Sequence, residues 1–166
     1  MKKDNRGFSL IELIVILAIL GIISTGAVLG LGAINGRPAD QCARALKMAL
    51  TNHRLSTMGT ETASMRIYMD SDGAVWVEEK LDGAVTNTKA CSRGVSIKIH
   101  YIGSSTVDEM GSGGTNAVNV SFDRQNGKFV IGQNIDYLEI SKASHVYKLK
   151  FYNLTGKVSL ERITGP

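Results

Sequence analysis

The chain is poor in the residues that usually carry chemistry or stiffen a fold. It has two cysteines, two prolines, three histidines and one tryptophan among 166 residues. The histidines stand apart, without the spacing or the neighbouring Cys or Glu of a metal site, so no metal and no other cofactor is predicted. The sequence also lacks a nucleophile–base arrangement and the Gly-x4-Gly-Lys-Ser/Thr motif that cradles phosphates. We therefore expect a protein that is not an enzyme.

Basic residues are few and dispersed. The formal net charge is +4, and half of it comes from the start of the chain, where Lys2, Lys3 and Arg6 outweigh Asp4. No cluster of Lys and Arg interleaves with aromatic residues, which is the pattern of a nucleic-acid interface. The sequence predicts no contact with nucleic acid.

Charge is absent from one long stretch, because no charged residue occurs from Leu13 to Gly36. As a helix, this stretch would extend about 36 Å, enough to cross a hydrocarbon core of about 30 Å. The basic residues in front of it predict a cytoplasmic amino terminus and place residues 37–166 outside. Glu12 stands at the head of the run. A carboxylate in hydrocarbon costs several kcal/mol unless a partner neutralises it, which makes Glu12 a candidate functional residue.

Two simpler interpretations of this segment compete. An ordinary secretory signal also begins with basic residues, and its removal would release a secreted protein such as an enzyme. However, its apolar core usually has about 7–15 residues and gains nothing from a carboxylate. The second interpretation is that Glu12 only reaches the membrane surface with its carboxylate.

Residues 6–13 read Arg-Gly-Phe-Ser-Leu-Ile-Glu-Leu. This segment resembles the class III signal of type IV prepilins and pseudopilins, in which a short basic leader ends in Gly and a Glu is the fifth residue after the cut. The resemblance implies that prepilin peptidase cuts between Gly7 and Phe8, that Phe8 becomes methylated, and that Glu12 is the fifth residue. It divides the chain into a leader (1–7), a transmembrane and filament-core helix (8–36), and an extracytoplasmic head (37–166).

The chemistry of such a cut is consistent with assembly. It creates an α-amino group on Phe8, which is a cation at neutral pH. In a stack of identical or related subunits this cation can neutralise Glu12 of a neighbour and set the axial register. The family resemblance further implies an assembly platform protein, an assembly ATPase and other pilin subunits as partners. It also implies a single-pass membrane precursor that becomes a surface pilus or pseudopilus.

Both cysteines, Cys42 and Cys91, fall outside the membrane in this topology, where oxidation is allowed. A disulfide between them would close a loop of about 50 residues and stabilise the fold by about 4 kcal/mol in the chain-entropy model. The alternative is two separate thiols, with Cys42 packed as a small apolar residue.

The remainder predicts an α+β fold of pilin-like layout, with a long amino-terminal helix packed on an antiparallel sheet. Pro38 and Asp40 suit a helix start, and a stripe of spacing three and four that includes His53 predicts a helix to about Met58. Residues 104–116 read as a flexible surface loop. Period-two patterns bounded by Gly and Asn turns predict eight strands, at about 64–69, 74–79, 95–101, 117–122, 128–131, 137–140, 146–152 and 157–162.

The order of these elements is also similar, less specifically, to H-type minor pseudopilins, through the turns at Asn126-Gly127 and Thr155-Gly156. We therefore expect a structural subunit of a type IV pilus or a related filament. The alternatives are a minor pseudopilin of a type II secretion or DNA-uptake system, and a membrane-anchored binding module that does not polymerise.

Overall fold

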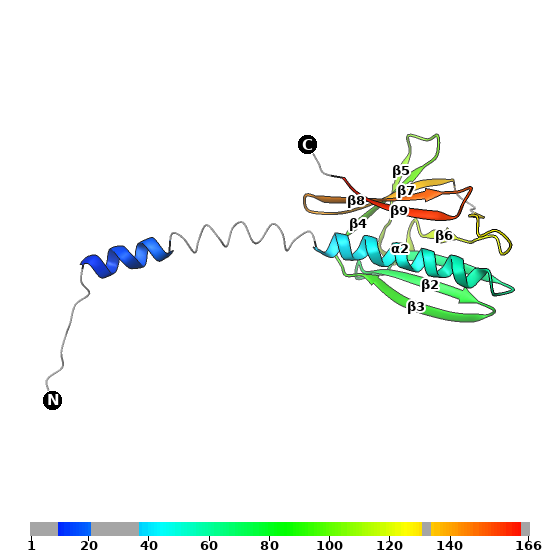
Figure 1. Cartoon of the computed structure of the whole chain (residues 1–166), viewed down its shortest axis with the longest axis horizontal. Coiled ribbons are helices and arrows are strands. Elements are labelled where there is room, and N and C mark those ends of the chain that lie inside the picture. Colours follow the sequence, from blue (N-terminus) through cyan, green and yellow to red (C-terminus); the bar gives the residue numbers. More distant parts are fainter. Residues whose placement is uncertain (1–9, 21–36, 131–133, 164–166) are drawn as a thin grey trace, which may run out of the picture. The chain divides into compact units, whose positions relative to one another are not determined.

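The structure, a computed structural model, describes residues 10–20, 37–130 and 134–163. The chain separates into two compact units, Met1–Asn35 and Gly36–Pro166. In the first unit, residues 10–20 form an α-helix (Figure 1). No helix within the described ranges combines the length and the apolar character needed to cross a membrane.

The predicted long amino-terminal helix is therefore not confirmed as one apolar rod. The described part of it consists of the helix at 10–20, and residues 21–36 lie outside the described residues. Eleven residues extend about 16 Å, roughly half of a hydrocarbon core. Residues 10–20 contain no glycine, which lowers helix propensity by about 1 kcal/mol relative to Ala, and their composition is consistent with the helix found there.

The second unit begins with helix α2, Arg37–Thr57, close to the predicted bounds. Asp40 lies in its first turn and Arg54 in its last, so both charges complement the helix dipole. Arg44 Nε donates to both carboxylate oxygens of Asp40, at 3.0 and 2.9 Å. The buried side of α2 follows the predicted stripe and consists of Ala39, Cys42, Ala43, Leu46, Leu50, His53 and Thr57.

The strands form two antiparallel sheets, where the sequence predicted one. The first has the order β3-β2-β1-β6, and the second has the order β5-β4-β7-β8-β9. The α+β class and the antiparallel pairing are thus confirmed. The strands are β1 Ala63–Met69, β2 Val75–Leu81, β3 Ala84–Cys91, β4 Ser96–Tyr101, β5 Val107–Glu109, β6 Val118–Val120, β7 Ile135–Lys142, β8 His145–Tyr152 and β9 Lys157–Ile163.

The sequence analysis missed two strands, and one strand that it predicted is much shorter in the structure. Strand β3 is a sheet edge whose first six residues are all exposed, so it has no alternation of polar and apolar residues to detect. The predicted loop at 104–116 contains β5, which pairs with β4 over three residues. The predicted strand at 128–131 is reduced to a single bridge between Phe122 and Phe129, and its last residue lies outside the described part.

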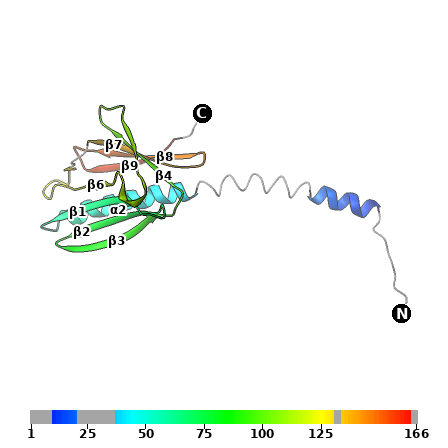
Figure 2. The same cartoon turned by 180° about the vertical axis from the view of Figure 1, so that it is seen from behind.

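Helix α2 contacts both sheets, with β2 and β3 on one side of it and β8 and β9 on the other (Figures 1 and 2). One hydrophobic cluster joins the helix to the inner faces of the two sheets. Leu46 and Leu50 of α2, Ile67 of β1, Ile99 of β4 and Leu149 of β8 are all almost completely buried in it. The apolar stripe of one helix therefore stabilises both sheets at once.

Candidate functional site in the amino-terminal helix and the contacts of helix α2

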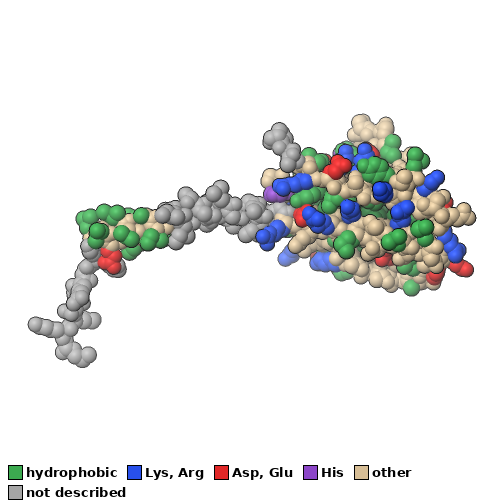
Figure 3. Space-filling view, in the orientation of Figure 1, with side chains coloured by type: hydrophobic (Ala, Val, Ile, Leu, Met, Phe, Trp, Pro, Cys, Tyr) green, Lys and Arg blue, Asp and Glu red, His purple; other side chains and the backbone are tan. Residues whose placement is uncertain are grey.

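The helix at residues 10–20 is apolar around its whole circumference. Its nine large apolar side chains are each 44–78 % exposed, and Glu12 is exposed as its one charged residue. The visible side of this helix is mostly apolar in the space-filling view (Figure 3). A helix that is hydrophobic all round is stable where apolar material surrounds it, as in a membrane or a packed core. A segment of this composition therefore favours apolar surroundings.

Glu12 gives that apolar surface one chemically distinct point. A carboxylate surrounded by hydrocarbon requires a cation or hydrogen-bond donors. Gly7 and Phe8, the predicted processing residues, lie outside the described residues, so the structure does not place them relative to Glu12.

Cys42 and Cys91 form a disulfide in the structure, with their Cα atoms 4.7 Å apart. Cys42 lies on the buried side of α2 and Cys91 is the last residue of β3, and both are buried. The bond therefore fastens the helix to the edge strand of the first sheet. It anchors β3 at its buried end, whereas the first six residues of the strand are exposed.

A second link between α2 and the first sheet pairs a buried histidine with a carboxylate. His53 is 0 % exposed, and its Nδ1 lies 3.2 Å from Oε1 of Glu79 on β2. This distance is within ion-pair reach, but the geometry does not align a hydrogen bond, and both ring nitrogens lack a hydrogen-bond partner within the described ranges. Burial lowers the pKa of His53 below 6.5, and the nearby Glu79 carboxylate only partly opposes this effect. His53 is therefore neutral in the folded head at neutral pH.

The depressed pKa of His53 predicts that the head domain loses stability on mild acidification. Below pH 6.5 the unfolded state takes up a proton that the folded state resists, so the free energy of unfolding falls as pH decreases. The slope for this one group is at most about 1.4 kcal/mol per pH unit. Urea unfolding at pH 7.5 and pH 5.5 measures the loss, and the variant His53→Leu is expected to show a smaller difference between the two pH values. If the variant lost as much stability between the two pH values as the native chain, another group would be responsible for the acid sensitivity.

The carboxyl-terminal half of α2 also holds two glycine turns together. Arg54 Nε donates to the carbonyl oxygen of Gly127 at 2.8 Å. Gly127 and Gly156 both have φ of +65°, and a Cβ added to Gly156 would collide with the backbone of Gly127. The two turns therefore pack so closely that glycine is required at Gly156 on both conformational and steric grounds. The sequence identified each turn, but only the fold shows that they meet at Arg54.

The turn between β1 and β2 is organised by Asp70. Its Oδ1 accepts hydrogen bonds from the backbone amides of Asp72 and Ala74, at 3.0 and 2.8 Å. Its Oδ2 accepts a bond of 2.7 Å from Nε1 of Trp76. These hydrogen bonds lower the pKa of Asp70, and the bond from the Ala74 amide has the largest effect. The carboxylate thus serves as the organiser of a hairpin turn.

Residues 2–28 match the family model of the prokaryotic N-terminal methylation motif. The match includes Gly7, Phe8 and Glu12, and it indicates a protein that is processed in the manner of type IV prepilins and pseudopilins. This supports a place among type IV pilin-like proteins, with a membrane-anchored precursor, processing by prepilin peptidase and pilin-type assembly. Neither the curated proteins nor the solved structures include a match to this chain.

Proposed function

We propose that the chain is a non-enzymatic structural subunit of a type IV pilus or a closely related filament. The observation that carries this proposal is an apolar helix with one carboxylate, Glu12, inside the segment that matches the methylation motif. Neither part alone would be enough, because a membrane anchor needs no carboxylate and an exposed carboxylate needs no apolar helix. Together they describe a segment that transfers from lipid into a core of neighbouring subunits.

In this mechanism the precursor waits in the membrane until its leader is removed. Hydrolysis of the Gly7–Phe8 peptide bond frees the α-amino group of Phe8 as a cation at neutral pH. When the helix enters the filament, the carboxylate of Glu12 on a neighbouring subunit meets this cation, and the pair removes the cost of burying either charge alone. Because the charges occur at fixed positions on the helix, the pair also sets the axial offset between subunits.

The resemblance supplies the remaining partners of the proposal. The chain has no motif for binding nucleoside triphosphates, so the energy for extraction from the membrane comes from a separate ATPase acting through a platform protein. The head, residues 37–166, forms the outer part of the subunit beyond the cytoplasmic membrane.

Processing gives the most direct test of this function. Mass spectrometry of the chain isolated from membranes or filaments is expected to show a mature amino terminus at Phe8 with one added methyl group. The variant Gly7→Leu is expected to accumulate as full-length precursor, because the residue before the cut no longer fits. A mature chain that begins well beyond Phe8 would instead assign the segment to ordinary signal peptidase and the head to a secreted protein.

A minor pseudopilin of a secretion or DNA-uptake machine is the second candidate function. It is favoured by the pairing of the turns at Gly127 and Gly156 on Arg54, because these turns carried the similarity to H-type minor pseudopilins. The two functions differ in stoichiometry. Quantitative mass spectrometry of purified filaments separates a principal component from one present at a few copies, and a chain absent from all filaments would support the non-polymerising anchor.

A further inference from the structure

The outer face of the first sheet carries a group of polar and aromatic side chains, here called the polar-aromatic face. Alternate residues of β1, β2 and β6 lie on it. The intervening residues, such as Met65, Ile67 and Val77, are buried and point into the core. The register places Arg66 beside Glu78 and Asn119, and Tyr68 beside Trp76. The polar-aromatic face comprises Ser64, Arg66, Tyr68, Trp76, Glu78, Lys80 and Asn119.

The aromatic pair on this face is held in a fixed position. Tyr68 and Trp76 are both half-buried, and the indole of Trp76 is tied to Asp70 by the 2.7 Å hydrogen bond. The guanidinium carbon of Arg66 lies 5.1 Å from the centre of the Tyr68 ring, within the range of a cation–π contact. The face therefore offers two rigid rings with little conformational entropy to lose when a ligand stacks on them.

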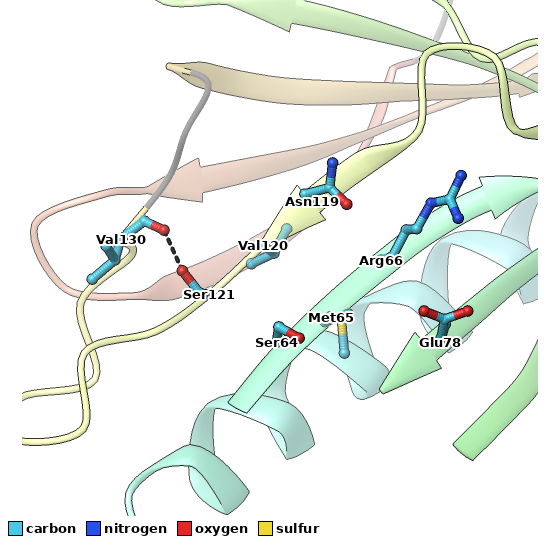
Figure 4. Close-up of a pocket in the computed structure, with 8 residues that line it drawn as sticks. All are labelled: Ser64, Met65, Arg66, Glu78, Asn119, Val120, Ser121 and Val130. Atoms are coloured by element: carbon cyan, nitrogen blue, oxygen red, sulfur yellow. Dashed lines mark hydrogen bonds between the residues drawn. The ribbon is translucent and has the colours of Figure 1, made fainter. Parts of the chain in front are cut away.

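Two small hollows adjoin the polar end of this face. The first has a volume of about 260 Å³, and Arg66, Glu78, Asn119 and Ser64 contribute to its lining. Figure 4 shows these side chains on the neighbouring strands β1, β2 and β6. The second, of about 280 Å³, is lined by Thr62, Ala63, Ser64 and Lys80, so the hollows meet at Ser64. Both are slightly smaller than the range of about 300–1,000 Å³ for drug-sized ligands.

The polar groups around the first hollow are available to a ligand. Within the part of the chain that the structure describes, no hydrogen bond or ion pair engages the side chains of Arg66, Glu78 and Asn119. Arg66 supplies donors in a fixed fork, Glu78 supplies two acceptor oxygens, and Asn119 supplies both kinds. This set of side chains matches a ligand whose neighbouring groups can both donate and accept hydrogen bonds.

The charges on this face are of both signs, which bears on the class of ligand. Glu78 is paired with Arg66 and lies two residues from Lys80 on β2. Lys89 of β3 is paired with Trp76, and Asp70 adds a second carboxylate beside Trp76. A polyanion such as single-stranded nucleic acid would meet Glu78 at the centre of its contact. A sugar ring has apolar C–H faces that stack on aromatic rings and neighbouring hydroxyls that both donate and accept. We propose that the polar-aromatic face binds a neutral saccharide, with its ring hydroxyls on Arg66, Glu78 and Asn119.

This binding can be measured on the single chain, because it needs no assembled filament. Trp76 is the one tryptophan of the sequence, so the intrinsic emission of the protein reports directly from the face. We would titrate the full chain in lauryldimethylamine oxide micelles, a detergent without a sugar headgroup, with cellotetraose, maltotetraose, chitotetraose and oligothymidine. A saturable change in emission is expected with at least one of the three saccharides and not with oligothymidine.

Variants test whether the named residues make the contact. Arg66→Ala and Asn119→Ala are each expected to weaken saccharide binding about tenfold, since each removes hydrogen bonds to the ligand. Lys98→Ala is the matched control, because Lys98 is a partly exposed residue of β4 in the other sheet, and it should leave binding unchanged. Equal thermal unfolding midpoints for all three variants would show that the fold is retained.

Three results would overturn the saccharide proposal. The first is that none of the three saccharides changes the emission up to its solubility limit. The second is tighter binding of oligothymidine than of every saccharide, which would assign the face to single-stranded nucleic acid. The third is saccharide binding that Arg66→Ala and Asn119→Ala leave unchanged, which would place the contact elsewhere on the chain.

Discussion

The substitution Glu12→Gln is expected to abolish, or nearly abolish, incorporation of the chain into filaments while leaving its level in the membrane unchanged. The change keeps the size and shape of the side chain and removes its charge. In lipid this change is favourable, because a neutral amide costs less than a carboxylate to place near hydrocarbon. The effect should therefore appear only at assembly, where the α-amino group of a neighbouring Phe8 would be left buried without its partner.

The size of this effect follows from the cost of breaking a buried pair. Removing one partner of a buried ion pair costs about 3–5 kcal/mol. At about 1.4 kcal/mol for each factor of ten, one subunit contact weakens by about a hundredfold to several thousandfold. Since every added subunit makes the same contact, a growing filament cannot tolerate a loss of this size.

The measurement compares the chain in sheared surface filaments with the chain retained in membranes, using an antibody against the head. Asp4→Asn is the matched control, because it makes the same chemical change in the leader that processing removes. It should leave filament yield unaltered. A normal filament yield from Glu12→Gln would remove the basis of the proposed assembly mechanism.

Loss of the Cys42–Cys91 disulfide is expected to lower the stability of the head by about 4 kcal/mol. The bond joins residues separated by 49 positions, and the chain-entropy model gives this value for a loop of about that length. Single domains are usually stable by only about 5–15 kcal/mol, so the reduced head would lie close to its unfolding threshold. The consequence would be largest at β3, the exposed edge strand that the bond ties to α2.

Urea unfolding of the oxidised chain, the reduced chain and the double variant Cys42→Ala/Cys91→Ala measures this contribution. The double variant serves as the control for the reductant, which should have no further effect on it. The oxidised native chain should also show no thiol that reacts with maleimide until it is reduced or unfolded. Equal stability of the oxidised and reduced chains would show that the packing of Leu46 and Leu50 holds the helix without the bond.

Local patterns predicted a large part of this fold. The stripe from Cys42 to His53 identified α2, because helix periodicity is a property of neighbouring residues and needs no tertiary contact. The hairpin of β1 and β2 was equally accessible, since alternation and the turn at Asp70–Gly73 occur within a few residues. The edge strand β3 was missed for the complementary reason: its first six residues are all exposed, so they lack the alternation of buried and exposed positions that marks a strand in the sequence.

The candidate sites also differ in whether the sequence alone could predict them. Gly7, Phe8 and Glu12 could be recognised because processing acts on a contiguous segment, and the matching family model covers that same segment. The pairing of His53 with Glu79 could not be predicted, because they lie 26 positions apart in the chain and each is ordinary in its local context. The polar-aromatic face was also hidden, since Asn119 reaches Arg66 only through the pairing of β6 with β1.

The sequence by itself determined the amino-terminal motif, the position of α2, the antiparallel class and the residues that form the turns. These properties depend on the order of neighbouring residues, which the chain carries whether or not it is folded. Only the tertiary structure decided that the strands divide into two sheets, that one helix serves both, and that Gly127 meets Gly156 at Arg54. Those outcomes depend on which distant surfaces bury the most apolar area together, and burial is a property of the whole packed core rather than of any one segment.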